Sequence, residues 1–208
     1  LPVVVPATYP DIFPGGAITA GVAYGCASGV AEAFDCMGGR ARSDAKELGA
    51  KVRRASPHKG PWPKVQVWQG SADHTVVPSN ADAIVLQWTN LHGLAPKPDR
   101  EDRVAGYPRR AWSGADGTPL IEQYTITGMA HGVPLAGGED ALGKAGAHML
   151  DVGLSSTARI AAFFGIAPEE EAKPRPKRAR RQRKGGAPEA SGPQAVMEKA
   201  LKGGGLMG

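Results

Sequence analysis

Two side chains that could share a proton each follow an apolar, strand-like run of the sequence. Asp73 stands three residues after a run that ends at Gly70, and His131 stands just beyond the run at 120–127. A carboxylate that holds an imidazole in one tautomer is the supporting half of a Ser-His-Asp hydrolytic site. The alternative is ordinary turn chemistry, because aspartate is common wherever a strand ends. The sequence therefore offers an acid–base pair, provided that the fold brings the two residues together.

Four apolar runs are expected to form the strands that position this pair. They cover residues 15–24, 64–69, 107–112 and 120–127. The first run is rich in small residues, which is typical of a buried strand that other backbone approaches closely. The Ala-Asp-Gly at 115–117 predicts a hairpin between the last two runs. In open α/β sheets, reacting groups lie beyond the carboxyl ends of strands, which is where the acid and the histidine stand.

A helix is expected between the second and third of these runs. Ser79 begins a sequence that resembles a capping box. Ile84, Trp88 and Leu91 then recur at the spacing of one helical face, and Gly93 supplies a C-terminal stop. Strands that alternate with helices predict an α/β fold with a mostly parallel sheet.

Two proline-containing segments are expected to be irregular. Pro2 and Pro6 disfavour a continuous helix at the front of the chain. Residues 94–106 hold two further prolines and a cluster of charges, which predicts an exposed loop. Between these segments, the charged stretch at 40–60 predicts a surface helix followed by a loop.

The net charge of +5 arises entirely from the end of the chain. Residues 1–167 carry 15 Lys+Arg and 15 Asp+Glu, whereas residues 168–208 carry 10 and 5. The composition predicts one folded domain over 1–167 and a disordered tail over 168–208. The basic run at 173–184 could contact nucleic acid or an anionic surface, but it has no aromatic residue and no folded module around it, which favours a solvated tail. No apolar run approaches the ~20 residues of a membrane helix, so no membrane span is predicted.

Cys26 and Cys36 are the two cysteines of the sequence. A disulfide between them would contribute roughly 3 kcal/mol in the chain-entropy model, and it would imply an oxidising compartment. Two buried free thiols are the alternative. No histidine stands near either cysteine, so this segment does not offer the ligands of a metal site.

Three separated blocks of the sequence resemble the poly(3-hydroxybutyrate) depolymerase-like esterases, which are α/β-hydrolases related to the feruloyl and acetylxylan esterases. The resemblance extends over about residues 8–166. The blocks are YPDIFPGGAITAGVAYGCA at 9–27, WPKVQVWQGSADHTVVPSNA at 62–81 and YTITGMAHGVPL at 124–135.

The resemblance assigns roles to individual residues. It implies that Asp73 is the acid and His131 the base of a catalytic triad, and acid before histidine is the chain order of α/β-hydrolases. Cys26 and Cys36 match cysteines that family members often carry. The family is secreted or cell-associated, so a secreted or periplasmic location is implied. The implied substrate is a polyester or oligoester, and neither a metal nor a cofactor is expected.

The sequence departs from that family at the nucleophile. The family's serine lies in a G-L-S-A-G-G elbow shortly before the A-T-Y-P segment, which here begins at Ala7. The first serine of this chain is Ser28, and it does not stand in a G-x-S-x-G setting. We therefore expect the C-terminal part of such an esterase, truncated or frame-shifted at its front. It would have an incomplete sheet that lacks N-terminal strands, no nucleophilic serine and no visible signal peptide.

Three functions are compatible with these features. The first is a serine esterase of the depolymerase type, for which Trp62 and Trp112 could line an apolar polymer-binding surface. The second is a carbohydrate esterase that acts on feruloyl or acetyl esters. The third is a non-catalytic protein whose basic tail binds nucleic acid or polymer granules.

Overall fold

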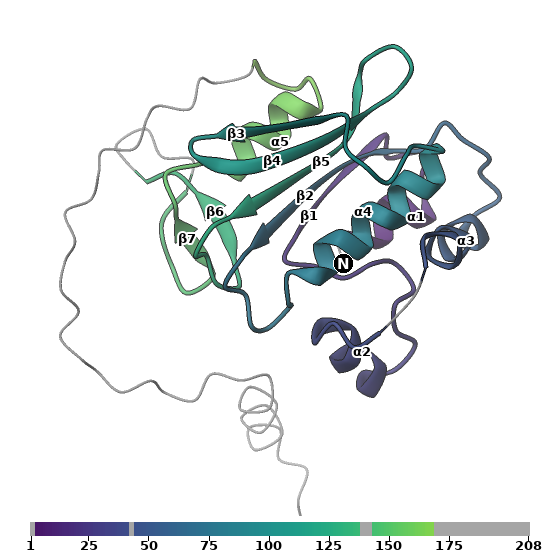
Figure 1. Ribbon diagram of the computed structural model, residues 1–208, viewed down its shortest axis with the longest axis horizontal. Coiled ribbons are helices and arrows are strands. Elements are labelled where there is room, and N and C mark those ends of the chain that lie inside the picture. The colour runs from purple at the N-terminus through teal and green to yellow at the C-terminus, as the bar shows by residue number, and fades with distance from the viewer. Residues whose placement is uncertain (1–2, 42–43, 138–142, 169–208) are drawn as a thin grey trace, which may run out of the picture. The chain divides into compact units, whose positions relative to one another are not determined.

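The computed structural model describes residues 3–41, 44–137 and 143–168, all within one compact unit of the chain. The predicted disordered tail over 168–208 lies outside the described residues, apart from Pro168. Figure 1 shows a sheet with helices on both of its faces. Its strands are β1 (Gly15–Thr19), β2 (Lys64–Gly70), β3 (Arg100–Val104), β4 (Tyr107–Ser113) and β5 (Pro119–Ile126), and a separate pair is formed by β6 (Val133–Leu135) and β7 (Met149–Asp151). The helices are α1 (Val4–Thr8), α2 (Val30–Met37), α3 (Ala45–Ala55), α4 (Ser79–His92) and α5 (Ser156–Phe163).

The strands of the larger sheet follow the order β1-β2-β5-β4-β3. The first three are parallel to one another, and β4 and β3 continue the sheet in antiparallel fashion. The predicted α/β class is therefore confirmed, with an antiparallel meander at one edge of a parallel core. The predicted hairpin is confirmed as well, because β4 pairs with β5 and Gly117 takes a positive φ of 78° in the turn between them.

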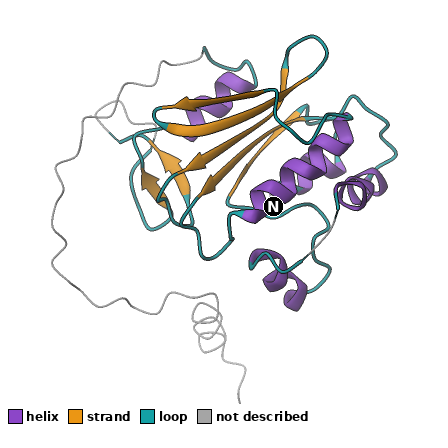
Figure 2. Ribbon diagram, in the orientation of Figure 1, coloured by secondary structure: helices purple, strands orange, loops and turns teal. Residues whose placement is uncertain are grey.

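Helices cover both faces of the sheet, and the side chains of each strand alternate between these two faces. Figure 2 shows α1, α3 and α4 on one side of the sheet and α5 on the other. Val65 and Val67 of β2 belong to the apolar core shared with α4, and Trp68 belongs to a second cluster that includes Ile160 of α5. Strand β2 is thus buried on both faces, and its buried positions hold Gln66 and Gln69 as well as apolar residues.

Helix α4 confirms the predicted helical face. Ile84 and Trp88 are fully buried, Leu91 is nearly so, and Gly93 ends the helix with a left-handed φ of 68°. The prediction that Ser79 caps the helix was wrong, because the residue at the cap position is Pro78 and no side chain caps the first turn. The helix is fixed instead by burial of its apolar face.

Two further predictions from the sequence were wrong. The loop expected at 94–106 contains strand β3, whose four consecutive charged residues do not resemble a strand, although charged side chains are typical of an edge strand. The front of the chain forms the short helix α1 even though it contains Pro6. Pro6 lies in the first turn of that helix, where a backbone N–H has no intrahelical partner and its loss costs little. The helix expected within 40–60 is confirmed as α3.

None of the described helices is long and apolar enough to cross a membrane. The two edge strands of the sheet, β1 and β3, each pair with one neighbour among the described residues, and β1 lacks the charges that β3 carries. Strand β1 pairs only with β2, and Tyr9, Ile12 and Phe13 just before it are exposed by 56%, 64% and 43%.

We predict that the edge of β1 promotes self-association of the 208-residue chain, because an uncharged edge strand is a template for pairing with another chain. A change of Ala17→Lys should raise the concentration for half-association by roughly fivefold, since like charges across paired strands cost up to about 1 kcal/mol. Sedimentation velocity over a concentration series measures this effect. Ala95→Lys, which adds the same charge in an exposed loop, is the control. Equal association of the two variants would contradict the prediction.

Cys26 and Cys36 form a disulfide, with their Cα atoms 6.2 Å apart, and the described residues contain no free cysteine. The bond ties the segment that follows β1 to the end of α2. The disulfide prediction is confirmed, and the alternative of two free thiols was wrong.

Loss of this bond should lower the free energy of unfolding by about 3 kcal/mol, because the cross-link restricts the unfolded chain. Urea unfolding of the oxidised chain and of the Cys26→Ser/Cys36→Ser double variant measures the difference. Dithiothreitol should destabilise the natural chain and leave the double variant unchanged. If dithiothreitol shifted the urea midpoint of the natural chain and of the double variant equally, the bond would contribute nothing to stability.

Candidate active site

The parallel pairing of β2 with β5 brings the ends of two distant segments to the same edge of the sheet. Gly70 at the end of β2 is opposite Ile126 at the end of β5. Asp73 and His131 follow these strands and meet there, with 2.9 Å between Asp73 Oδ2 and His131 Nδ1. The contact joins residues 58 positions apart in the chain. The structure thus brings together the two residues that the sequence singled out.

The carboxylate of Asp73 is held by several hydrogen bonds. Its side chain is fully buried. Oδ1 accepts from the backbone N–H groups of Thr75 and Val76, each at 2.9 Å, and Oδ2 accepts from Gln69 Nε2 at 3.2 Å as well as contacting His131. Asp73 therefore stabilises the turn that follows β2 and also contacts the histidine. The bonds of the turn fix the orientation in which the carboxylate meets the imidazole.

Gln69 is a part of this site that the sequence analysis missed. It is buried, and its Nε2 donates to the backbone carbonyl of Val76 at 2.9 Å in addition to Asp73. It thereby links the strand, the turn and the acid. The sequence offered one signal for this role, an amide side chain within the strand expected at 64–69. A polar group that is buried in a strand requires a hydrogen-bond partner.

The loop that carries the histidine lies directly against the end of β2. Ala72 donates its N–H to the carbonyl of Met129 at 3.0 Å. A Cβ atom on Gly70 would lie 2.2 Å from the Met129 carbonyl oxygen and 2.8 Å from that of Ala130. Only glycine allows the two backbones to approach this closely.

We therefore predict that Gly70→Ala pushes the 129–131 loop away from β2 and destabilises the fold by about 1–3 kcal/mol, the usual cost of overpacking. Urea unfolding measures the stability, and the imidazole shifts of His131 report on its displacement. Gly29→Ala is the matched control, because a Cβ at Gly29 meets nothing within 4 Å. The same stability for both variants would contradict a required close approach.

His131 presents its second ring nitrogen away from the acid. Its side chain is 33% exposed, and Nε2 makes no hydrogen bond with a described residue. A carboxylate at Nδ1 favours the tautomer with the proton on Nδ1, which leaves Nε2 able to accept a proton. His148 lies beside it, with ring centroids 6.0 Å apart, whereas His74, next to the acid in the chain, is exposed.

A serine hydroxyl is the remaining part of a triad. No described serine donates a hydrogen bond to His131: Ser28 bonds to Glu32, for example, and Ser156 to the carbonyl of Pro134. Two other serines lie outside the described residues. Among the described residues, no cluster of three or more His, Cys, Asp or Glu side chains could hold a metal ion.

The two tryptophans proposed for polymer binding differ in their surroundings. Trp112 is only 2% exposed, and its Nε1 donates to the carbonyl of Pro96, so the prediction that it lines an open surface was wrong. Trp112 instead belongs to the apolar core shared with α4, together with Leu91 and Ile121. Trp62 is half-buried against the core and makes an edge contact with the ring of His58.

In sequence, the chain is similar to a depolymerase and to an esterase. The chain is 45% identical over 166 residues to a poly(3-hydroxyalkanoate) depolymerase C from Paucimonas lemoignei, covering 78% of this chain and 40% of the relative. It is 36% identical over 141 residues to an acetylxylan esterase from Coprinopsis cinerea, covering 65% of this chain and 37% of that protein. The chain thus spans about two fifths of the length of these relatives. No model of a protein family matches it.

A solved structure supports the fold. The chain superposes on an acetyl xylan esterase from Aspergillus awamori with a TM-score of 0.62 and 19% sequence identity, over 80% of this chain and 55% of the other. At this identity the likeness shows a shared fold. The sheet and helices described above thus share the α/β fold of that protein.

Proposed function

Because the chain is related in sequence to the poly(3-hydroxybutyrate) depolymerase-like esterases, we propose that Asp73 and His131 are the acid and base of a serine-type carboxylic ester hydrolase. The observation that carries the proposal is the 2.9 Å contact between Asp73 Oδ2 and His131 Nδ1 at the carboxyl ends of two parallel strands. In an α/β sheet this is the edge at which reacting groups gather.

The geometry supports a two-step reaction. His131 Nε2 takes the proton of a serine hydroxyl as its oxygen attacks the ester carbonyl carbon, and the imidazolium then protonates the leaving alcohol. Water hydrolyses the resulting acyl-enzyme by the same proton transfers in reverse roles, which releases the acid and restores the serine. Asp73 keeps the imidazole in the required tautomer and stabilises its charged form. This chemistry requires neither a metal nor a cofactor.

We propose that the nucleophilic serine is supplied by a segment outside the 208-residue chain, because Ser43 and Ser191, which lie outside the described residues, do not stand in a G-x-S-x-G setting. Two observations support this: no described serine bonds to His131, and the relatives are more than twice as long as the part that matches. The 208-residue chain by itself should then lack hydrolytic activity.

The proposed substrate is a polyester or its oligoesters. The higher identity to the depolymerase than to the acetylxylan esterase, 45% against 36%, supports this choice over a carbohydrate ester, which is the second candidate. The disulfide between Cys26 and Cys36 supports function in an oxidising compartment outside the cytosol.

A hybrid enzyme tests the proposal. The aligned residues of this chain replace the matching 166 residues of the Paucimonas lemoignei depolymerase, and hydrolysis of p-nitrophenyl butyrate is measured beside that of the 208-residue chain alone. We expect turnover by the hybrid and none above buffer by the chain. Clearing of a polyhydroxybutyrate film against release of acetate from acetylated xylan then separates the two substrate classes.

Two results would contradict the proposal. A hybrid that folds, as judged by circular dichroism, but lacks turnover would contradict the roles proposed for Asp73 as the acid and His131 as the base. A burst of p-nitrophenol from the chain alone would show that it contains its own nucleophile.

A further inference from the structure

A polar network crosses the face of the sheet that lies under α5. Gln66 on β2, Glu122 on β5 and Arg109 on β4 all project to this face, where an apolar core would be expected. The side chains of Arg109 and Glu122 are only 11% and 7% exposed. Burying charged groups is costly unless they are paired, so their partners decide what this face can bind.

The network satisfies its own charges. Glu122 accepts from Gln66 at 2.7 Å, from Arg109 at 3.1 Å and from the Tyr124 hydroxyl at 3.3 Å. Arg109 also donates two hydrogen bonds to Asp102, at 2.8 and 2.6 Å, and this lowers the pKa of that carboxyl. Burial raises the pKa of Tyr124, which keeps its hydroxyl protonated and donating. The carboxylates of Glu122 and Asp102 are therefore already paired with donors of the protein.

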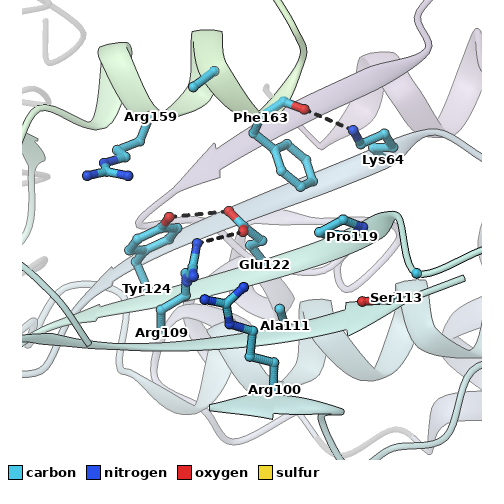
Figure 3. Close-up of a pocket in the computed structure, with 12 residues that line it drawn as sticks. Lys64, Arg100, Arg109, Ala111, Ser113, Pro119, Glu122, Tyr124, Arg159 and Phe163 are labelled. Carbon is cyan, nitrogen blue, oxygen red and sulfur yellow. Dashed lines mark hydrogen bonds and ion pairs between the residues drawn. The ribbon is translucent and has the colours of Figure 1, made fainter. Parts of the chain in front are cut away.

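A cavity of about 420 Å³ lies between this network and α5 (Figure 3). Lys64, at the start of β2, lines it. The ammonium donates to the carbonyl of Phe163 at 2.9 Å and lies 4.5 Å from the centroid of that ring. Both partners are uncharged, and Lys64 forms no ion pair with a described carboxylate. The cavity thus holds a half-buried cation whose charge is not balanced by a neighbouring acid.

The other residues that line the cavity indicate which kind of ligand it can bind. Three arginines also line the cavity, namely Arg100, Arg109 and Arg159. Arg100 and Arg109 are paired with Asp102 and Glu122, and Arg159 makes contacts of its own, so the charge that decides the kind of ligand is that of Lys64. Phe163 and Pro119 supply apolar surface. The wall therefore combines an excess of positive charge with an apolar side, and the volume is within the range of small-molecule sites.

We propose that this cavity binds a small organic monocarboxylate, whose carboxylate pairs with Lys64 while its apolar part packs against Phe163 and Pro119. The site is separate from the acid–base pair, because neither Asp73 nor His131 lines the cavity. It does not depend on the proposed hydrolase activity, since binding requires only the described sheet and α5.

Isothermal titration calorimetry of the 208-residue chain with butyrate tests the proposal. Butyrate should bind, and neutral butyramide, which has the same shape, should not. Lys64→Met keeps the apolar stem and removes the charge, so it should weaken butyrate binding about tenfold or more, as expected for a charge-assisted hydrogen bond. Lys59→Met, which removes an exposed lysine that does not line the cavity, should leave the affinity unchanged.

A second variant protects the test from effects of Lys64 on folding. Ala162→Phe fills part of the cavity while all four cations remain, and it should also weaken binding. Absence of butyrate binding to the natural chain would overturn the proposal, as would equal affinity in Lys64→Met and Lys59→Met. Tighter binding of inorganic phosphate than of butyrate would likewise overturn the choice of a monocarboxylate.

Discussion

Replacement of His131 by alanine in the active hybrid should lower kcat by about 10⁶, the loss seen when a triad histidine is removed from a serine protease. Without the imidazole, no group accepts the proton of the serine hydroxyl or returns it to the leaving alcohol. KM should change little, because the ring binds the reacting atoms rather than the acyl chain. Initial rates on p-nitrophenyl butyrate over a range of concentrations give both constants.

His148→Ala is the matched control for this variant. His148 is the histidine whose ring lies 6.0 Å from that of His131, but it is exposed and does not contact the acid. Its removal should change kcat by less than about tenfold, as for a neighbouring residue outside the proton-transfer path. If the two alanine variants lost similar activity, His131 would not be the base.

The second large effect is expected for Asp73→Asn, which should lower kcat by about 10⁴, as in the protease precedent. The remaining amide oxygen can still accept from the N–H groups of Thr75 and Val76, so the turn should persist. Its NH₂ group, however, would meet His131 Nδ1 as a donor and force the ring proton onto Nε2. The base would then be in the wrong tautomer to accept a proton from serine.

Circular dichroism and urea unfolding should show that Asp73→Asn remains folded, which separates this tautomer effect from a loss of structure. Asp82→Asn is the control, because Asp82 is an exposed carboxylate on α4 that pairs with Arg110 of β4. A wild-type kcat for Asp73→Asn would mean that the residue serves only the turn.

The elements that the sequence predicted well are those whose signal is local. The helical face of α4 and the hairpin turn at Gly117 each depend on residues close together in the chain. The contact of Asp73 with His131 depends on strand order, and it could be anticipated because parallel strands end at a common edge.

The parts that were missed depend on neighbours that the sequence does not reveal. Strand β3 carries four consecutive charged residues, Arg100 to Arg103, and was taken for a loop. Trp112 shares a core cluster with Leu91 of α4, a neighbour that its local sequence does not reveal. Gln69 makes its contacts with the acid and with Val76 only after the turn has formed. The cavity beside Lys64 likewise exists only because α5 packs over polar residues from three strands.

The tautomer of His131 in the 208-residue chain is the most direct measurement of the central claim, that Asp73 holds the ring with Nε2 ready to accept a proton. Nitrogen-15 NMR of the neutral imidazole distinguishes a protonated Nδ1 from a protonated Nε2, and it requires no nucleophile. We predict a proton on Nδ1 in the natural chain and on Nε2 in Asp73→Asn. A proton on Nε2 in the natural chain would contradict the assignment of His131 as the base.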